Sequence, residues 1–69
     1  MIEFKLTTEY IPLFVLLKLT GLSETGGQAK LAISQGRVIV NGKVETRKAC
    51  KIRAGQSVSF AGETILIEK

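Results

Sequence analysis

The side chains with the clearest chemical character in this sequence are seven Lys and Arg residues between positions 30 and 53. Only one acid, Glu45, lies among them, whereas the rest of the chain carries three basic and five acidic residues. The net charge of +4 therefore combines a local excess of six positive charges with two net negative charges elsewhere. Charge segregated in this way attracts polyanions, of which a phosphate backbone is the commonest. The seven residues are Lys30, Arg37, Lys43, Arg47, Lys48, Lys51 and Arg53.

Residues suited to catalysis are scarce. The chain has no histidine and no aspartate, and its six glutamates are scattered, so no acid–base pair is evident. Cys50, the only cysteine, has basic neighbours that would lower its pKa if the thiol were exposed. It lacks a histidine or second cysteine to complete a catalytic or zinc site, so we predict a half-buried structural thiol. We therefore expect no enzyme activity, no metal and no cofactor.

A second candidate binding feature is a pair of glycines at the start of a predicted helix. Thr25 and Gln28 have the spacing of a capping box, in which the Gln side chain reaches back to the cap, and Gly36 should end the helix. Gly26 and Gly27 are unfavourable there, because each costs about 1 kcal/mol relative to Ala inside a helix. Two explanations stay open. This turn packs tightly against a preceding helix, or a phosphate approaches the free amides at the positive helix end.

The elements that position these residues follow from periodicity. Residues 2–6 alternate between apolar and charged side chains, which predicts a half-buried strand. Pro12 suits the first turn of a helix that should run to about Thr20 and stop at Gly21. On that helix Ile11 and Val15 lie off the main core face. They either meet the N-terminal strand or form a small exposed apolar patch.

The basic residues fall mainly in an all-β half. Alternation from Arg37 and the dipeptide Asn41-Gly42 predict a hairpin. The return strand begins at Val44, but its register stays open, because the basic residues that follow could lie in a loop or a bulge. Two more strands are expected at 57–60 and 64–67, each preceded by a glycine-containing turn.

We therefore predict a single α+β domain over residues 1–69, with two helices packed on a small twisted antiparallel sheet. The longest apolar run, residues 10–17, is shorter than the roughly 20 residues that cross a membrane. No export signal opens the chain and no internal disulfide is possible, so a cytoplasmic protein is expected.

The aromatic residues refine the expected mode of binding. All four lie outside the basic segment, so the sequence indicates no platform on which splayed bases could stack. A cationic surface without aromatic residues grips phosphate backbone and shape, which favours structured RNA or a helical junction. The four are Phe4, Tyr10, Phe14 and Phe60.

One pattern is similar to a known family. The spacing Thr25-x-x-x-Ala29-x-x-x-Ile33-x-x-Gly36-x-Val38-x-Val40-Asn41-Gly42, with Gly55 further on, resembles the RNA-binding domain named after ribosomal small-subunit protein S-four, also called the alpha-L motif. The resemblance covers about residues 13–60. Residues 26–30, together with 45–47 and Lys51, are most similar to the short stand-alone bacterial members.

The resemblance implies that two helices and the following hairpin form one RNA-facing surface. This chain departs from the family pattern at two places. Thr25-Gly26 stands where many members have Ser-Arg, and Arg47-Lys48-Ala49 stands where many have an Asp/Asn-Pro-Ser turn. The helix-start arginine contact is therefore lost, and the backbone amides or Arg47 and Lys48 would have to replace it.

The predicted function is that of a non-catalytic RNA-binding protein that contacts structured RNA, ribosomal RNA for example, through a basic helix–hairpin face. The alternative is a small adaptor that binds a protein partner through an apolar patch or a sheet edge. Neither a membrane nor a small-molecule substrate is expected. The predicted RNA contacts are Gly26, Gly27, Gln28, Lys30, Arg37, Lys43, Arg47, Lys48, Lys51 and Arg53.

Overall fold

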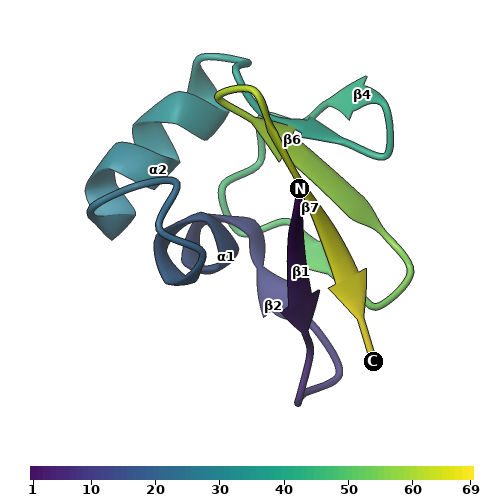
Figure 1. Ribbon diagram of the computed structural model, residues 1–69. Coiled ribbons are helices and arrows are strands. Elements are labelled where there is room, and N and C mark those ends of the chain that lie inside the picture. Colours follow the sequence, from purple (N-terminus) through teal and green to yellow (C-terminus); the bar gives the residue numbers. More distant parts are fainter.

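Two helices pack on one side of a five-stranded sheet in the computed structural model, which describes residues 1–69 (Figure 1). The α+β prediction is thereby confirmed. Neither helix has the length and apolar composition of a membrane-spanning segment. The elements are β1 (Ile2–Lys5), β2 (Ile11–Pro12), α1 (Leu13–Leu19), α2 (Gly26–Ser34), β3 (Ile39–Val40), β4 (Lys43–Val44), β5 (Lys51–Ile52), β6 (Ser57–Phe60) and β7 (Glu63–Glu68).

The sheet is mixed rather than wholly antiparallel. Its strand order is β1-β7-β6-β3-β4, and β1 pairs with β7 in parallel, with Phe4 opposite Ile67. The other pairs of this sheet are antiparallel, and short turns join β3 to β4 and β6 to β7, as antiparallel neighbours allow. No such turn links β1 to β7, since almost the whole domain lies between them. Local sequence signals therefore could not predict the direction of this pairing.

The core lies between the sheet and the helices. Leu13, Leu16 and Leu17 of α1 are fully buried, as are Ala29 and Ile33 of α2. The sheet side of the core is formed by Val58, Ile65 and Ile67, with Val38 from the segment before β3 and Ile52 from β5.

Of the two alternatives for Ile11 and Val15, the exposed apolar patch is not present. Ile11 is only 7% exposed and pairs with Ile52 across the β2–β5 pair, and Val15 packs against the core while partly buried. The helical wheel misplaced Ile11 because this residue precedes the helix and belongs to a strand. Of the two contact surfaces considered for the adaptor hypothesis, only the sheet edge is left.

The start of α1 is held by a distant part of the chain. The helix begins at Leu13, one residue later than expected, and no side chain caps it. Instead, the N–H of Leu13 donates to the Cys50 carbonyl at 2.9 Å, and the N–H of Phe14 donates to the Lys48 carbonyl at 3.1 Å. These bonds satisfy donors that a helix start leaves free. They fix the segment after β4 as a loop against α1, which resolves the loop or bulge alternative.

The predicted hairpin is present, with Asn41 and Gly42 at φ values of 51° and 83°. Both residues adopt the left-handed conformation that a two-residue hairpin turn requires. The Asn41 side chain also accepts a hydrogen bond from the Ser57 N–H at 2.9 Å, which ties the turn to β6. The strand predicted at 57–60 is confirmed, and β7 extends one residue beyond each end of the predicted 64–67.

Candidate nucleic-acid interface

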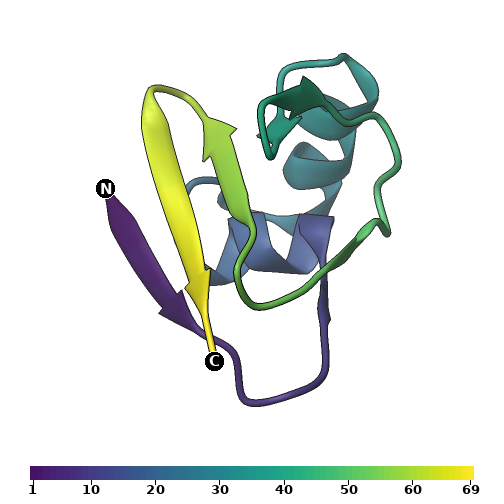
Figure 2. The same cartoon turned by 90° about the vertical axis from the view of Figure 1, so that its right-hand side faces the viewer.

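Five basic residues gather around the start of α1, although they come from two separate parts of the chain. Four of them come from the segment that runs from the loop after β4 through β5. The carbonyls of this loop accept the hydrogen bonds from Leu13 and Phe14, and β5 pairs with β2. The fifth, from α2, has its Nζ 4.6 Å from the centre of the Phe14 ring. In Figure 2 the loop runs along the right-hand edge of the domain, opposite β1. We call this set the cationic strip; it comprises Lys30, Arg47, Lys48, Lys51 and Arg53.

Two aromatic side chains lie within the cationic strip, so the expectation that no aromatic residue accompanies the basic segment was wrong. The Lys51 Nζ lies 5.0 Å from the Tyr10 ring centre, and the Arg53 guanidinium carbon lies 5.7 Å from it. These separations are within the range of cation–π attraction, as is that of Lys30 from Phe14. Tyr10 is 38% exposed. The pairing of β2 with β5 brings together residues that are about forty positions apart in sequence.

The two arginines of the cationic strip are paired with acids, whereas its three lysines are not. Arg47 binds the Glu45 carboxylate with both Nε and Nη2, at 3.0 and 3.1 Å, and its backbone N–H donates to the same group at 2.9 Å. Arg53 forms a more exposed pair with Glu9 at 3.3 Å, which contributes little stability. A polyanion would therefore meet Lys30, Lys48 and Lys51 as the uncompensated charges.

The ion pair with Arg47 also changes two nearby ionisation equilibria. Side-chain and backbone hydrogen bonds from Arg47 lower the pKa of Glu45 from 4.5 to about 2. The pKa of the Cys50 thiol is raised, first by burial and then by the negative charge of Glu45. The sequence predicts a half-buried structural thiol, and the partly buried Cys50 agrees with it, although basic residues surround it in the chain. In space, burial and the acid outweigh them, as a structural thiol requires.

The Glu45–Arg47 pair should make stability depend on pH. Because folding lowers the pKa of Glu45, the stabilisation is fully present above pH 4.5 and is lost as the pH falls toward about 2. We expect Glu45→Gln to lower the free energy of unfolding at neutral pH, and the deficit to shrink between about pH 5 and pH 2. Urea denaturation of both proteins across this range measures it. A deficit that stays constant with pH would mean that the ionised pair does not stabilise the fold.

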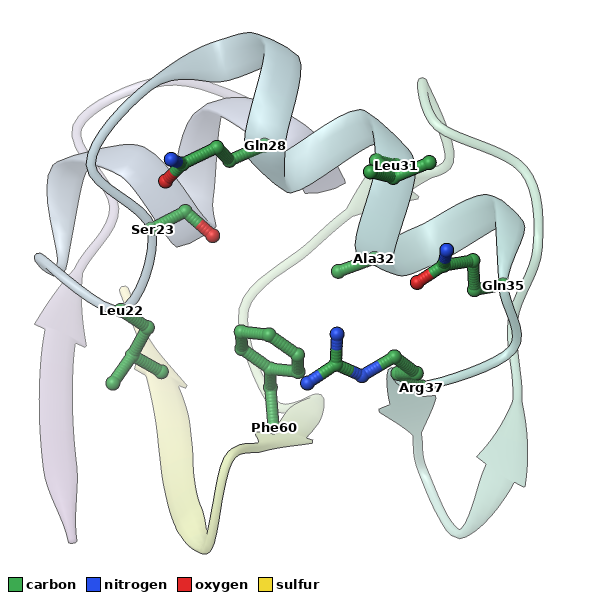
Figure 3. Close-up of a pocket in the computed structure, with 8 residues that line it drawn as sticks. All are labelled: Leu22, Ser23, Gln28, Leu31, Ala32, Gln35, Arg37 and Phe60. Atoms are coloured by element: carbon green, nitrogen blue, oxygen red, sulfur yellow. The ribbon is translucent and has the colours of Figure 1, made fainter.

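Helix α2 separates the predicted contact residues into two groups. Gly26 and Lys30 lie on the flank that contacts Phe14 of α1. Gln28 lies on the opposite flank, because successive helical residues are rotated by about 100°. That flank faces Arg37, whose guanidinium carbon is 5.6 Å from the Phe60 ring centre (Figure 3). Gln28 and Arg37 are therefore not part of the cationic strip.

Lys43 is also outside the cationic strip. It is exposed in β4, directly after the hairpin turn and at the edge of the sheet. The predicted single surface of ten residues is thus divided among the cationic strip with the start of α2, the Gln28–Arg37 side of α2, and the hairpin. Sequence spacing could not reveal this division, since it depends on which flank of α2 each residue occupies.

The start of α2 has the predicted cap and no packing reason for its glycines. Thr25 Oγ1 accepts a hydrogen bond from the Gln28 backbone N–H at 3.1 Å. The Gln28 side-chain oxygen Oε1 accepts one from the Glu24 N–H, one residue before the expected partner. A Cβ on Gly26 would meet Phe14 at 3.7 Å, an ordinary contact, and one on Gly27 would meet only Thr25 Oγ1 at 3.9 Å. The tight-packing explanation is therefore wrong, and the phosphate explanation remains.

Comparisons with known proteins agree with one another. A family model described as the S4 domain matches residues 4–68. YbcJ of Escherichia coli K12, provisionally named an RNA-binding protein, is 59% identical over 58 residues, which are 84% of this chain and 83% of that protein. YbcJ of Shigella flexneri matches to the same extent. A solution structure of E. coli YbcJ, described as revealing an ALFAL motif involved in RNA-binding, is 53% identical with a TM-score of 0.77. This match covers 100% of this chain and 89% of the other.

Proposed function

The chain belongs to the S4 domain family, and from this membership we propose that it binds structured RNA through the cationic strip. The family is one of RNA-binding domains without catalytic activity, so the prediction of a non-enzymatic protein is confirmed. Ribosomal RNA is the ligand that we favour, because the resemblance is to a domain of a ribosomal protein. We place this function in the cytoplasm, where such RNA is found.

The observation that carries the proposal is the convergence of three unpaired lysines around the start of α1. Lys48 and Lys51 are held there by backbone hydrogen bonds and by the β2–β5 pair, and Lys30 is held by its contact with Phe14. Cations on a fixed backbone can match the spacing of phosphates with little loss of entropy on binding. Phosphate contacts supply most of the affinity of such interfaces and set their salt dependence.

The exposed Tyr10 ring gives the cationic strip a second type of contact. Beside Lys51 and Arg53, it offers a face on which a base could stack next to a phosphate contact. Structured RNAs present both features together, since their loops and bulges expose bases beside paired backbone. This combination supports structured RNA over an unstructured strand.

Salt dependence tests the proposal directly. If Lys30, Lys48, Lys51 and Arg53 each neutralise one phosphate, log K should fall with log salt at a slope of roughly −3 to −4. Affinities for an RNA hairpin, and for an unstructured A-rich strand of equal length, would be measured between about 50 and 200 mM KCl. We expect the hairpin to bind more tightly at every salt concentration. Absence of hairpin binding at the lowest salt would refute the proposal.

The identity of the RNA requires an experiment in cells. Crosslinking followed by sequencing of the recovered RNA should enrich one structured RNA, and ribosomal RNA should be enriched beyond its abundance in the lysate. The Lys48→Ala/Lys51→Ala variant serves as the background. Equal recovery by both proteins would show that the cationic strip does not select the RNA.

The glycines at the start of α2 allow stability and binding to be separated. Gly26→Ala and Gly27→Ala should each raise the free energy of unfolding by up to about 1 kcal/mol, because both positions have room for a Cβ. The same methyl groups should hinder a phosphate at the helix amides and weaken hairpin binding. Thermal unfolding and RNA affinity are measured together, with Ser34→Ala on the same helix as control. Unchanged affinity would remove these amides from the interface.

A further inference from the structure

A cavity of about 240 Å³ lies on the flank of α2 that faces away from the cationic strip. It is bounded by α2 on one side and by the end of β6 on the other (Figure 3). Gln28 and Leu31 of α2 line it, with Gln35 directly after the helix and Ser23 from the loop before it. Arg37 and Phe60 complete the opposite side.

Ser23 supplies the cavity with a hydroxyl group. The residue is only 7% exposed, and its backbone N–H is fixed by a hydrogen bond to the Leu17 carbonyl at 3.1 Å. Its hydroxyl points into the cavity, where the oxygen is open to solvent (Figure 3). A hydroxyl in a fixed position can donate one hydrogen bond to a ligand and accept others from it.

Arg37 and Phe60 present two planar groups at the mouth of the cavity. The guanidinium carbon lies 5.6 Å from the centre of the ring, and Arg37 forms no ion pair. Aromatic rings and guanidinium planes are the surfaces on which proteins stack unpaired RNA bases. A lysine would supply the same charge without the plane.

Two carboxamides add hydrogen-bonding groups of the kind that read a base edge. The Gln28 side-chain oxygen Oε1 already accepts a hydrogen bond from the Glu24 N–H at 3.3 Å, which leaves the side-chain NH₂ group for a ligand. Gln35 offers both a donor and an acceptor. No acidic residue lines the cavity, so nothing in it repels a nucleotide.

The size of the cavity limits the ligand. A volume of about 240 Å³ lies below the roughly 300–1,000 Å³ of sites that enclose whole small molecules. One planar heterocycle attached to a longer chain fits this limit, because only the ring has to enter. The exposed Leu31 at the rim adds apolar surface against which the edge of a base or a ribose can rest.

We propose that this cavity binds one unstacked base of the RNA, stacked on Arg37 and Phe60 and hydrogen-bonded by Ser23, Gln28 and Gln35. The proposal rests on the proposed function and extends it, because this flank of α2 is separate from the cationic strip. The protein would then contact the RNA on two sides of α2. One side holds phosphates and the other recognises an unpaired nucleotide.

The test compares hairpins that differ in one nucleotide. Four RNA hairpins each carry a single unpaired nucleotide, A, C, G or U, in an otherwise identical stem, and a fifth hairpin is fully paired. We expect at least one of the four to bind the wild-type protein about tenfold more tightly than the paired hairpin, a typical gain for one stacked base. Ser23→Ala and Gln35→Ala should each reduce that affinity about fivefold and leave binding to the paired hairpin unchanged.

Two further variants make the result decisive. Arg37→Lys keeps the charge but removes the stacking plane, so it should abolish the preference for the unpaired nucleotide, whereas Ser34→Ala on the same helix should preserve it. Gln35 is exposed, so its variant tests the cavity even if Ser23→Ala lowers stability. Equal affinity for all five hairpins would overturn the base site and leave the RNA-binding function standing. Absence of binding to any hairpin would overturn both.

Discussion

The Lys48→Ala/Lys51→Ala variant is expected to bind hairpin RNA about 100-fold more weakly than the wild-type protein. This corresponds to roughly 1.4 kcal/mol for each lysine, a typical value for a charge-assisted contact. Both lysines belong to the cationic strip and neither is paired with an acid. The slope of log K against log salt should also become less steep by about 2, because two phosphate contacts are lost. Fluorescence anisotropy with a labelled hairpin at several salt concentrations measures both quantities.

A matched control separates this effect from a change in net charge. Lys5→Ala/Lys69→Ala removes the same charge from exposed positions outside the cationic strip, and we expect its affinity to fall less than about threefold. Circular dichroism should show that both variants remain folded, since all four side chains are exposed. Equal losses in the two variants would mean that the RNA senses only the total charge of the domain.

Arg47 should behave differently from these lysines. Its guanidinium is already held by Glu45, so an RNA phosphate would have to compete with a carboxylate for it. Sequence alone gives Arg47 and Lys48 equal weight as neighbouring cations. We expect the larger contribution from Lys48, because electrostatic attraction depends on local compensation as well as on charge.

The second large effect is expected from Ile52→Ala. Ile52 is fully buried and pairs with Ile11 of β2, the strand directly before α1. Its side chain therefore anchors β5, and with it the loop after β4, to the start of α1. Truncation of a buried isoleucine costs about 2–5 kcal/mol. In a domain of fewer than about 70–80 residues, the hydrophobic core rarely supplies more than about 3–5 kcal/mol of stability. The variant should therefore be largely unfolded or barely stable at 25 °C, as urea denaturation would show.

Hydrogen exchange shows whether the loss of stability begins where we expect it. The Leu13 and Phe14 amides donate to carbonyls of the loop after β4. In Ile52→Ala, their protection against hydrogen exchange should fall more than that of amides in β6 and β7. Ile39→Ala is the control, because Ile39 is 38% exposed in β3, and its truncation should cost much less stability. A loss below about 1 kcal/mol for Ile52→Ala would show that β5 is not an anchor.

Features that depend on neighbouring residues could be predicted from the sequence. The cap at Thr25 and the turn at Asn41-Gly42 each follow from a few adjacent side chains, and both are confirmed. The family resemblance rests on the same kind of local spacing, so the family could also be recognised from the sequence. Local chemistry selects such elements, although helices as short as these need tertiary packing to be stable.

Features that depend on distant contacts could not be predicted. The hydrogen bond from Phe14 to Lys48 and the pairing of Ile11 with Ile52 join segments that carry no mutual signal in one sequence. The cation–π contacts of Tyr10 depend on these pairings, which is why the aromatic residues were placed away from the basic segment. The cavity beside α2 was missed for the same reason, since Ser23 and Phe60 meet only in the folded domain.

The parallel pairing of β1 with β7 affects the order in which this protein can fold. Ile2 lies opposite Ile65, so the first strand has no partner until the ribosome has made nearly the whole domain. Until then, the backbone of β1 has no strand partner and its apolar side chains Ile2 and Phe4 are exposed, so this segment could mispair with other chains. Contacts between such distant residues also slow folding, because a long loop must close first. Closure of the sheet by β7 is thus expected to be a late step, after the helices and the central hairpin have formed.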